Sequence, residues 1–171
     1  EEVAQRAKFF YLNYPNNPTG AVATPKFYRK LVAWAKKYHV GIISDFAYGA
    51  IGFDGQAPVS FMETPGAKDV GIEFYTFSKT FNMAGWRIAF AVGNTDIIEA
   101  INLIQDHLFV SLFPALQEAA IDALTLPQRD EAIAEIIGRY EERRDAFINV
   151  TEKIGWHAFT PQKNMMVIQM C

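Results

Sequence analysis

Three short apolar runs in this chain each end in a cluster of polar side chains. The runs cover residues 8–12, 40–44 and 74–77, and their aromatic and β-branched residues are typical of buried strands. In an open α/β sheet, ligands bind beyond the carboxyl ends of the parallel strands. The sequence therefore predicts an α/β fold with a mainly parallel sheet, helices on both faces, and a small-molecule site at one edge of that sheet.

A fourth apolar run, residues 88–92, has the same character, and we expect all four strands to be buried on both faces. Between the first two runs, Thr24 before Pro25 is a typical helix N-cap, and apolar residues recur at helical spacing up to Tyr38. A strand, a helix and a second strand in this order predict a βαβ unit.

The second half of the chain has a helical pattern. Thr95 is expected to cap a helix over residues 96–107, and Pro114 to open another over residues 115–124. A long helix follows, and Gly155 is expected to end it because glycine readily adopts the left-handed conformation of a helix C-terminus.

Lys79 is the residue with the most specific chemistry. Within the segment from Thr76 to Arg87, Lys79 supplies one amine, Thr76 and Ser78 two hydroxyls, and Arg87 one guanidinium at the end of a strand. A neutral lysine amine condenses with an aldehyde, and an arginine anchors a phosphate dianion. The pairing indicates pyridoxal phosphate, although a lysine and an arginine in a polar loop are, taken alone, more often solvated surface charges.

Two upstream motifs strengthen this interpretation, and together the motifs resemble those of the class I/II aminotransferases, fold-type I enzymes that use pyridoxal 5'-phosphate. The turn Asn17–Gly20 corresponds to the family's Asn-Pro-x-Gly, and Asp45 with Tyr48 to its Asp-x-x-Tyr pair. The segment 78–87 corresponds to its lysine attachment signature. Thr76 departs from the family, which usually has Gly or Ser three residues before the lysine.

The resemblance implies roles for four residues around the cofactor ring. Lys79 would form the Schiff base with pyridoxal phosphate and then carry a proton during catalysis. Asp45 would lie against the pyridine nitrogen, and Tyr48 and Asn17 would donate hydrogen bonds to the phenolic oxygen of the cofactor. Without the family motifs, Asp45 and Asn17 would be interpreted as turn residues and Tyr48 as a half-buried tyrosine at a strand end.

Three further residues are expected to bind the cofactor phosphate. Arg87 offers a planar fork suited to two phosphate oxygens, and Ser78 and Thr76 add hydroxyl donors. Strand geometry decides whether both hydroxyls reach the phosphate or one of them faces the core, and the sequence leaves this open.

The resemblance also implies a domain organisation. Residues 1–129 would be the C-terminal part of the cofactor-binding large domain, residues 130–154 the interdomain helix, and residues 155–171 the first strand of a truncated small domain. We therefore expect the chain to be an internal fragment of a longer enzyme and to be inactive in isolation. Relatives are dimers, so a homodimer is expected for the parent protein.

Charge and composition restrict the partners. The formal net charge is -3, with 16 basic and 19 acidic residues mixed along the chain, which indicates no footprint for nucleic acid or an anionic membrane. Cys171 is the single cysteine, which fits a reducing compartment, and we expect a cytoplasmic protein. The three histidines are isolated from one another, so no metal site is expected.

The function indicated by these features is transfer of an amino group between an amino acid and a 2-oxo acid. The local sequences of residues 45–50 and 81–87 resemble those of aspartate, alanine and methionine-salvage aminotransferases of Gram-positive bacteria. The choice among their substrates stays open. Two alternatives also stay open: a carbon-sulfur lyase on the same fold, and a non-catalytic cofactor-sensing domain of a transcription regulator.

Overall fold

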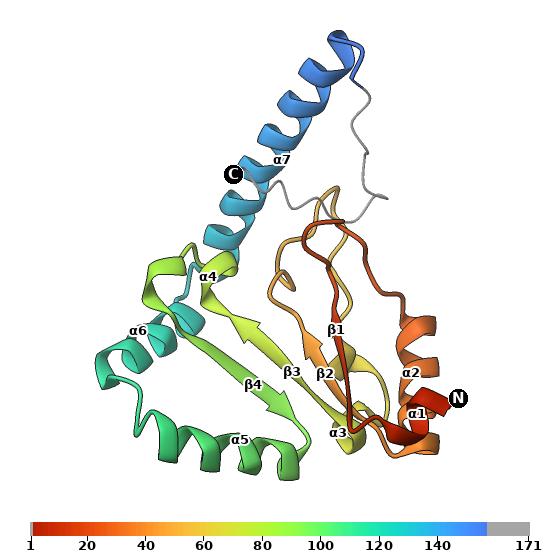
Figure 1. The fold of residues 1–171 in the computed structure, drawn as a ribbon. Helices are drawn as coiled ribbons and strands as arrows, with labels where there is room; N and C mark the ends of the chain where they lie inside the picture. Colours follow the sequence, from red (N-terminus) through yellow and green to blue (C-terminus); the bar gives the residue numbers. More distant parts are fainter. Residues whose placement is uncertain (1, 157–171) are drawn as a thin grey trace.

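The fold is known from a computed structural model that describes residues 2–156, and it consists of a four-stranded sheet with helices packed around it (Figure 1). In chain order the elements are α1 (Glu2–Arg6), β1 (Phe9–Asn13), α2 (Pro25–Tyr38), β2 (Gly41–Asp45), η1 (Phe61–Glu63), α3 (Ala67–Val70), β3 (Gly71–Thr76), α4 (Phe77–Thr80), η2 (Ala84–Trp86), β4 (Ala89–Gly93), α5 (Thr95–Leu108), α6 (Pro114–Thr125) and α7 (Arg129–Lys153).

The sheet has the strand order β1-β2-β3-β4. The pairs β1–β2 and β2–β3 are parallel, whereas β4 runs antiparallel to β3. The predicted α/β class and the mainly parallel sheet are therefore confirmed. Because the three parallel strands end at the same edge, the polar residues that follow them are brought to one end of the molecule.

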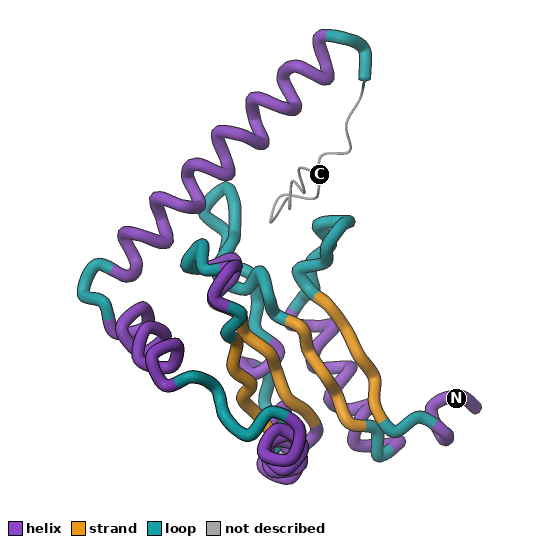
Figure 2. Tube along the Cα trace, turned by 60° about the vertical axis from the view of Figure 1, so that its left-hand side comes forward, coloured by secondary structure: helices purple, strands orange, loops and turns teal. Residues whose placement is uncertain are grey.

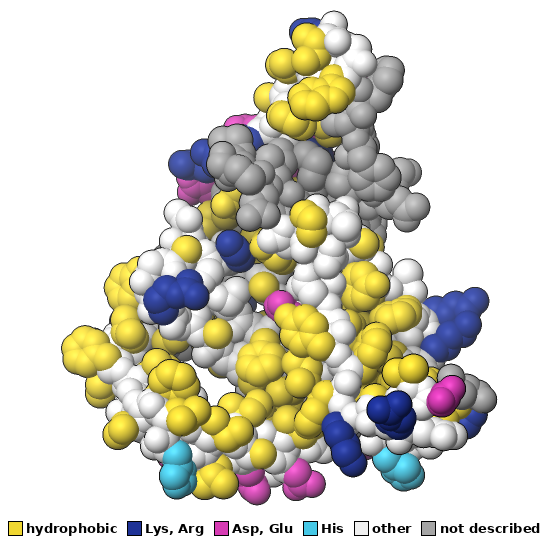
Figure 3. All heavy atoms as spheres, in the orientation of Figure 1, with side chains coloured by type: hydrophobic (Ala, Val, Ile, Leu, Met, Phe, Trp, Pro, Cys, Tyr) yellow, Lys and Arg dark blue, Asp and Glu magenta, His cyan; other side chains and the backbone are white. Residues whose placement is uncertain are grey.

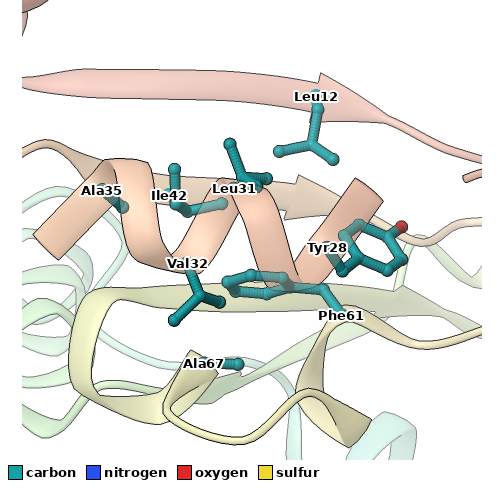
Figure 4. Close-up of a cluster of buried hydrophobic side chains, with 8 residues drawn as sticks. All are labelled: Leu12, Tyr28, Leu31, Val32, Ala35, Ile42, Phe61 and Ala67. Carbon is teal, nitrogen blue, oxygen red and sulfur yellow. The ribbon is translucent and has the colours of Figure 1, made fainter. Parts of the chain in front are cut away.

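Helix α2 forms the main core against one face of the sheet. Its N-cap is Thr24, as predicted, and the Thr24 side chain accepts a hydrogen bond from the backbone N–H of Phe27 at 3.1 Å. The buried face of α2 packs on β1, β2 and the segment after β2 (Figure 4). The cluster contains Leu12, Tyr28, Leu31, Val32, Ala35, Ile42, Phe61 and Ala67. Burial of each large side chain there contributes roughly 1.5–3 kcal/mol.

The prediction that all four strands are buried on both faces is wrong for β1 and β4. Phe9 and Tyr11 of β1 are 53% and 60% exposed, and Phe90 of β4 is 38% exposed. Among the described residues, both strands lie at the edges of the sheet and have a hydrogen-bonded neighbouring strand on one side only. Figure 3 shows hydrophobic side chains gathered on the surface over this part of the fold.

The helix ends agree with the sequence patterns in most places. Pro114 opens α6, and Gly155 follows α7 with a φ of +74°, as predicted. The expected cap of α5 is wrong by one residue: Asn94, in extended conformation, accepts from the backbone N–H of Ile97 at 3.1 Å, and Thr95 is already inside the helix.

Helix α7 is a long rod that extends away from the sheet (Figures 1 and 2). Near the sheet it is fixed to the loop after β2, where the guanidinium of Arg144 donates two hydrogen bonds of 2.9 Å to the Asp54 carboxylate. Phe53 is buried beside Ile137 and Tyr140 of the helix. The strand expected within residues 155–171 lies almost wholly outside the described residues, so it stays a prediction.

Within residues 2–156, every helix is too short or too polar to cross a lipid bilayer.

Candidate active site

The candidate site lies at the edge of the sheet where the parallel strands end. Asn13, the last residue of β1, pairs with Asp45, the last residue of β2, and Asp45 pairs with Phe74 of β3. Strand β3 continues through Thr76 directly into α4, the single helical turn that carries Lys79. A cavity of about 250 Å³ opens at this edge. Its walls are formed by Tyr11, Asp45, Ala47, Phe74, Tyr75, Thr76 and Ala89.

The Asp45 carboxylate is held at both oxygens. Its Oδ2 accepts a hydrogen bond from the Tyr11 hydroxyl at 2.6 Å, and its Oδ1 accepts from the backbone N–H of Ala47 at 3.2 Å. The side-chain amide of Asn13 donates to the Asp45 backbone carbonyl at 3.1 Å. These contacts fix the end of β2 and direct a carboxylate into the cavity.

Tyr11 lines the cavity and donates to Asp45, and the sequence analysis did not single it out. Burial, followed by the hydrogen bond and the charge of Asp45, raises the pKa of the Tyr11 hydroxyl to about 12. Tyr11 therefore stays a neutral hydrogen-bond donor at physiological pH. The signal that could have found it is the strand register, because β1 residues two apart share one face of the sheet and Asn13 pairs with Asp45.

Tyr48 and Asn17, both expected at the phenolic oxygen of the cofactor, lie in contact with each other. The side-chain amide of Asn17 donates to the Tyr48 hydroxyl oxygen at 3.1 Å. The turn that carries Asn17 is fixed in part by its own backbone N–H, which donates to Asn13 Oδ1 at 3.1 Å. The Tyr48 ring is buried with Ile51 and Phe53, so its hydroxyl is the part that reaches the site.

Lys79 lies next to Tyr48. Its ammonium nitrogen is 5.8 Å from the centroid of the Tyr48 ring, within the range of a cation–π contact, and the lysine is exposed. The short helix α4 is started by Thr76, whose side chain accepts from the backbone N–H of Ser78 at 3.1 Å. The strand end, the cap and the helical turn together direct Lys79 toward the residues that follow β2.

The three residues expected to bind the cofactor phosphate make mainly local contacts within the described residues. The Thr76 hydroxyl lines the cavity but is used locally, since it caps α4 and also lies 3.5 Å from the backbone carbonyl of Ile88. Ser78 contributes its backbone N–H to that cap. Arg87, with a φ of +54°, is exposed and donates to the backbone carbonyl of Ala84 at 2.9 Å. Within residues 2–156, the structure thus joins Lys79, Tyr48 and Asn17 and does not join Arg87 to them.

Comparison with known proteins gives consistent findings. The whole chain, residues 1–171, matches the family model described as aminotransferase class I and II. The L-glutamine–4-(methylsulfanyl)-2-oxobutanoate aminotransferase of Bacillus subtilis is 58% identical over 160 residues, which are 94% of this chain and 40% of that protein. An LL-diaminopimelate aminotransferase of Halothermothrix orenii is 46% identical over 156 residues, covering 91% of this chain and 40% of that protein.

A solved structure has the same fold as this chain. The substrate-bound structure of BacF from Bacillus subtilis matches with a TM-score of 0.90 and 52% sequence identity, over 96% of this chain and 41% of that chain. The chain therefore spans about two fifths of the length of the relatives that it matches.

Proposed function

Because this chain belongs to the aminotransferase class I and II family, we propose that it carries part of the active site of an enzyme that moves an amino group between an amino acid and a 2-oxo acid. Members of the family depend on pyridoxal phosphate. The observation that carries the proposal is the position of Lys79, whose ammonium group lies over the ring of Tyr48 while Asn17 binds the hydroxyl of that tyrosine.

The chemistry of the donor set fits pyridoxal phosphate. Asp45 offers a carboxylate in a cavity, which suits a protonated ring nitrogen. Tyr48 and Asn17 offer a hydroxyl and an amide, which suit the phenolic oxygen of the cofactor. Lys79 offers the amine that an aldehyde requires. When bound, pyridoxal phosphate supplies the electron sink that makes the α-proton of an amino acid removable.

Each of these residues would have a separate role in binding the cofactor or in moving a proton. The Lys79 amine would hold the cofactor while no substrate is bound, and, once the substrate amine has replaced it, the freed amine would accept and return the proton of the substrate α-carbon. Asp45 would keep a proton on the ring nitrogen, because a nearby carboxylate favours the charged form of a base. Tyr48 and Asn17 would stabilise negative charge on the phenolic oxygen through their hydrogen bonds.

We assign the phosphate to Arg87, Ser78 and Thr76. A guanidinium has five N–H donors, so the bond that Arg87 makes to Ala84 leaves donors for phosphate oxygens. Thr76 and Asp45 both line the cavity. The sequence resemblance is the main support for this part of the assignment.

The parent protein is proposed to be a cytoplasmic homodimer that acts on small amino and 2-oxo acids. The support is family resemblance: the relatives described above are aminotransferases named for different substrates, a methylsulfanyl oxo acid in one case and diaminopimelate in the other. Because the chain spans about two fifths of these relatives, we propose that it turns over poorly by itself.

Covalent labelling tests the proposed function. The chain is incubated with pyridoxal phosphate, reduced with borohydride and mapped by peptide mass spectrometry, and the cofactor is expected on Lys79 in preference to other lysines. Lys79→Arg should remove the selective label, whereas Lys153→Arg, the same change at an exposed lysine at the end of α7, should leave it in place. A label spread evenly over surface lysines would overturn the proposal.

A further inference from the structure

Tyr11 and Asp45 are brought together by the register of β1 and β2. Tyr11 pairs with Ile43 and Asn13 with Asp45. Side chains alternate between the faces of a strand, so Tyr11, two residues before Asn13, points to the same face as Asp45. The long tyrosine side chain spans the diagonal between neighbouring strands.

The contact has the geometry of a charge-assisted hydrogen bond. The Tyr11 hydroxyl lies 2.6 Å from Asp45 Oδ2, within the range of about 2.5–2.7 Å for a hydroxyl that donates to a carboxylate. The other carboxylate oxygen is held by the backbone N–H of Ala47 at 3.2 Å. The two donors come from different elements, β1 and the segment after β2, so together they fix the plane of the carboxylate.

The Asp45 carboxylate can still bind a ligand while both donors are in place. A carboxylate has roughly four acceptor positions, and Tyr11 and Ala47 occupy two of them. Both Tyr11 and Asp45 line the cavity of about 250 Å³, so the remaining positions are accessible from the space between β1 and β3. With a pKa raised to about 12, the Tyr11 hydroxyl keeps its proton and stays a donor across the neutral range.

We propose that Tyr11 is a positioning residue, which holds the Asp45 carboxylate in the orientation needed to accept a hydrogen bond from the ring nitrogen of the cofactor. This inference rests on the proposed function, because it takes Asp45 as the partner of that nitrogen. Tyr11 itself touches Asp45 and not the reacting atoms. The hydroxyl, and not the aromatic ring, is the part of the side chain that acts.

The test compares two ligands that differ at the ring nitrogen. Affinity of the chain is measured by calorimetry for pyridoxal phosphate and for its 1-deaza analogue, in which a carbon replaces that nitrogen. The unaltered chain should prefer pyridoxal phosphate about tenfold, the effect of one hydrogen bond to a charged group. Asp45→Asn should bring the ratio of the two affinities close to one, and Tyr11→Phe should lower it about threefold because orientation is lost.

The ratio separates positioning from a merely structural role. A structural change would weaken both ligands equally and leave the ratio as it was, which would overturn the proposal for Tyr11. Tyr14→Phe is the matched control, because Tyr14 packs its ring against Phe27 near α2, and this variant should keep the ratio of the unaltered chain. If Asp45→Asn also has no effect on the ratio, the assignment of Asp45 in the proposed function fails as well.

A second measurement needs no cofactor. The Tyr11 hydroxyl is titrated in the free chain by NMR with tyrosine labelled at the ring carbon that bears the oxygen. Tyr11 should titrate near pH 12 in the unaltered chain and at lower pH in Asp45→Asn, because the hydrogen bond and the charge are removed. A Tyr11 that titrates at its ordinary value near pH 10 in the unaltered chain would show that the contact is not made, and would overturn the proposal whether or not the cofactor binds.

Discussion

Asp45 and Glu73 are carboxylates on neighbouring strands, and their surroundings differ: one lines a cavity at a strand end, and the other lies inside the fold. Asp45 ends β2, lines a cavity, and accepts hydrogen bonds from Tyr11 and from the backbone N–H of Ala47. Glu73 lies within β3 and is completely buried. Both accept a hydrogen bond from a tyrosine, so the type of partner does not distinguish them.

Four donors surround the Glu73 carboxylate inside the fold. Three are hydroxyls, and the fourth is a backbone N–H. They belong to Ser44 at 3.0 Å, Tyr75 at 2.6 Å, Ser60, and the backbone of Phe61 at 2.8 Å. With about four acceptor positions on a carboxylate, these donors leave Glu73 without capacity for a ligand.

The two carboxylates are linked through strand β2, but only Asp45 has acceptor positions left for a ligand. Ser44, which donates to Glu73, directly precedes Asp45 in β2. Glu73 therefore ties the strand that carries Asp45 to the strand that leads to Lys79. The buried carboxylate holds the framework, and the carboxylate at the strand end is left available for chemistry.

Replacement of Glu73 should give the largest effect. Glu73→Leu keeps most of the volume but leaves three hydroxyls and one N–H buried without an acceptor, and each such group costs about 1–3 kcal/mol. We expect the free energy of unfolding to fall by about 3 kcal/mol or more, measured by urea denaturation followed by circular dichroism. Asp45→Asn should change it by less than about 1 kcal/mol, since the amide oxygen still accepts from one of the two donors and the exposed Tyr11 can bind water instead. Equal losses of unfolding free energy in the two variants would contradict the distinction drawn between Glu73 and Asp45.

The pH dependence of Tyr11 should give a smaller effect. Its hydroxyl has a pKa of about 12 in the fold, against 10.0 ordinarily, so between these values the folded chain keeps a proton that the unfolded chain has lost. The resulting stability is complete below pH 10 and is lost as the pH rises toward 12. Tyr11→Phe lacks this component. Its unfolding free energy should fall less steeply than that of the unaltered chain between pH 10.0 and about 12.

Tyr75 also contributes to the pH dependence of the unfolding free energy, because it donates to Glu73 as Tyr11 donates to Asp45. Burial, followed by the hydrogen bond to Glu73, raises the pKa of the Tyr75 hydroxyl above its ordinary value. Tyr75 therefore adds to the loss of stability in both the unaltered chain and Tyr11→Phe. The difference between the two curves reports the raised pKa of the Tyr11 hydroxyl, to which burial and the contact with Asp45 both contribute, and identical curves would contradict this shift.

Local patterns in the sequence were sufficient for most of the fold. Thr24 followed by Pro25 located the start of α2 correctly, and Gly155 located the end of α7, because caps depend on the chemistry of one or two residues. The cap of α5 was misplaced because Asn94 and Thr95 are both good caps and the sequence alone does not show which one is extended.

Side-chain contacts between neighbouring strands could not be predicted from the sequence. The link between Tyr11 and Asp45 spans 34 positions and requires the register of two parallel strands. Glu73 lies in an apolar run that predicts a dry interior, and nothing local indicates that donors from β2 and η1 will surround it. The family motifs, by contrast, predicted a common site for Asn17, Tyr48 and Lys79, and these three residues lie side by side in the fold.

A crystal structure of this chain with pyridoxal phosphate would test the central claim most directly, since it would show which carboxylate the ligand uses. We expect the ring nitrogen within hydrogen-bond distance of Asp45, the aldehyde carbon joined to Lys79, and Glu73 still surrounded by its four protein donors. Pyridoxal phosphate bound elsewhere on the chain, or with its ring nitrogen turned away from Asp45, would contradict the account.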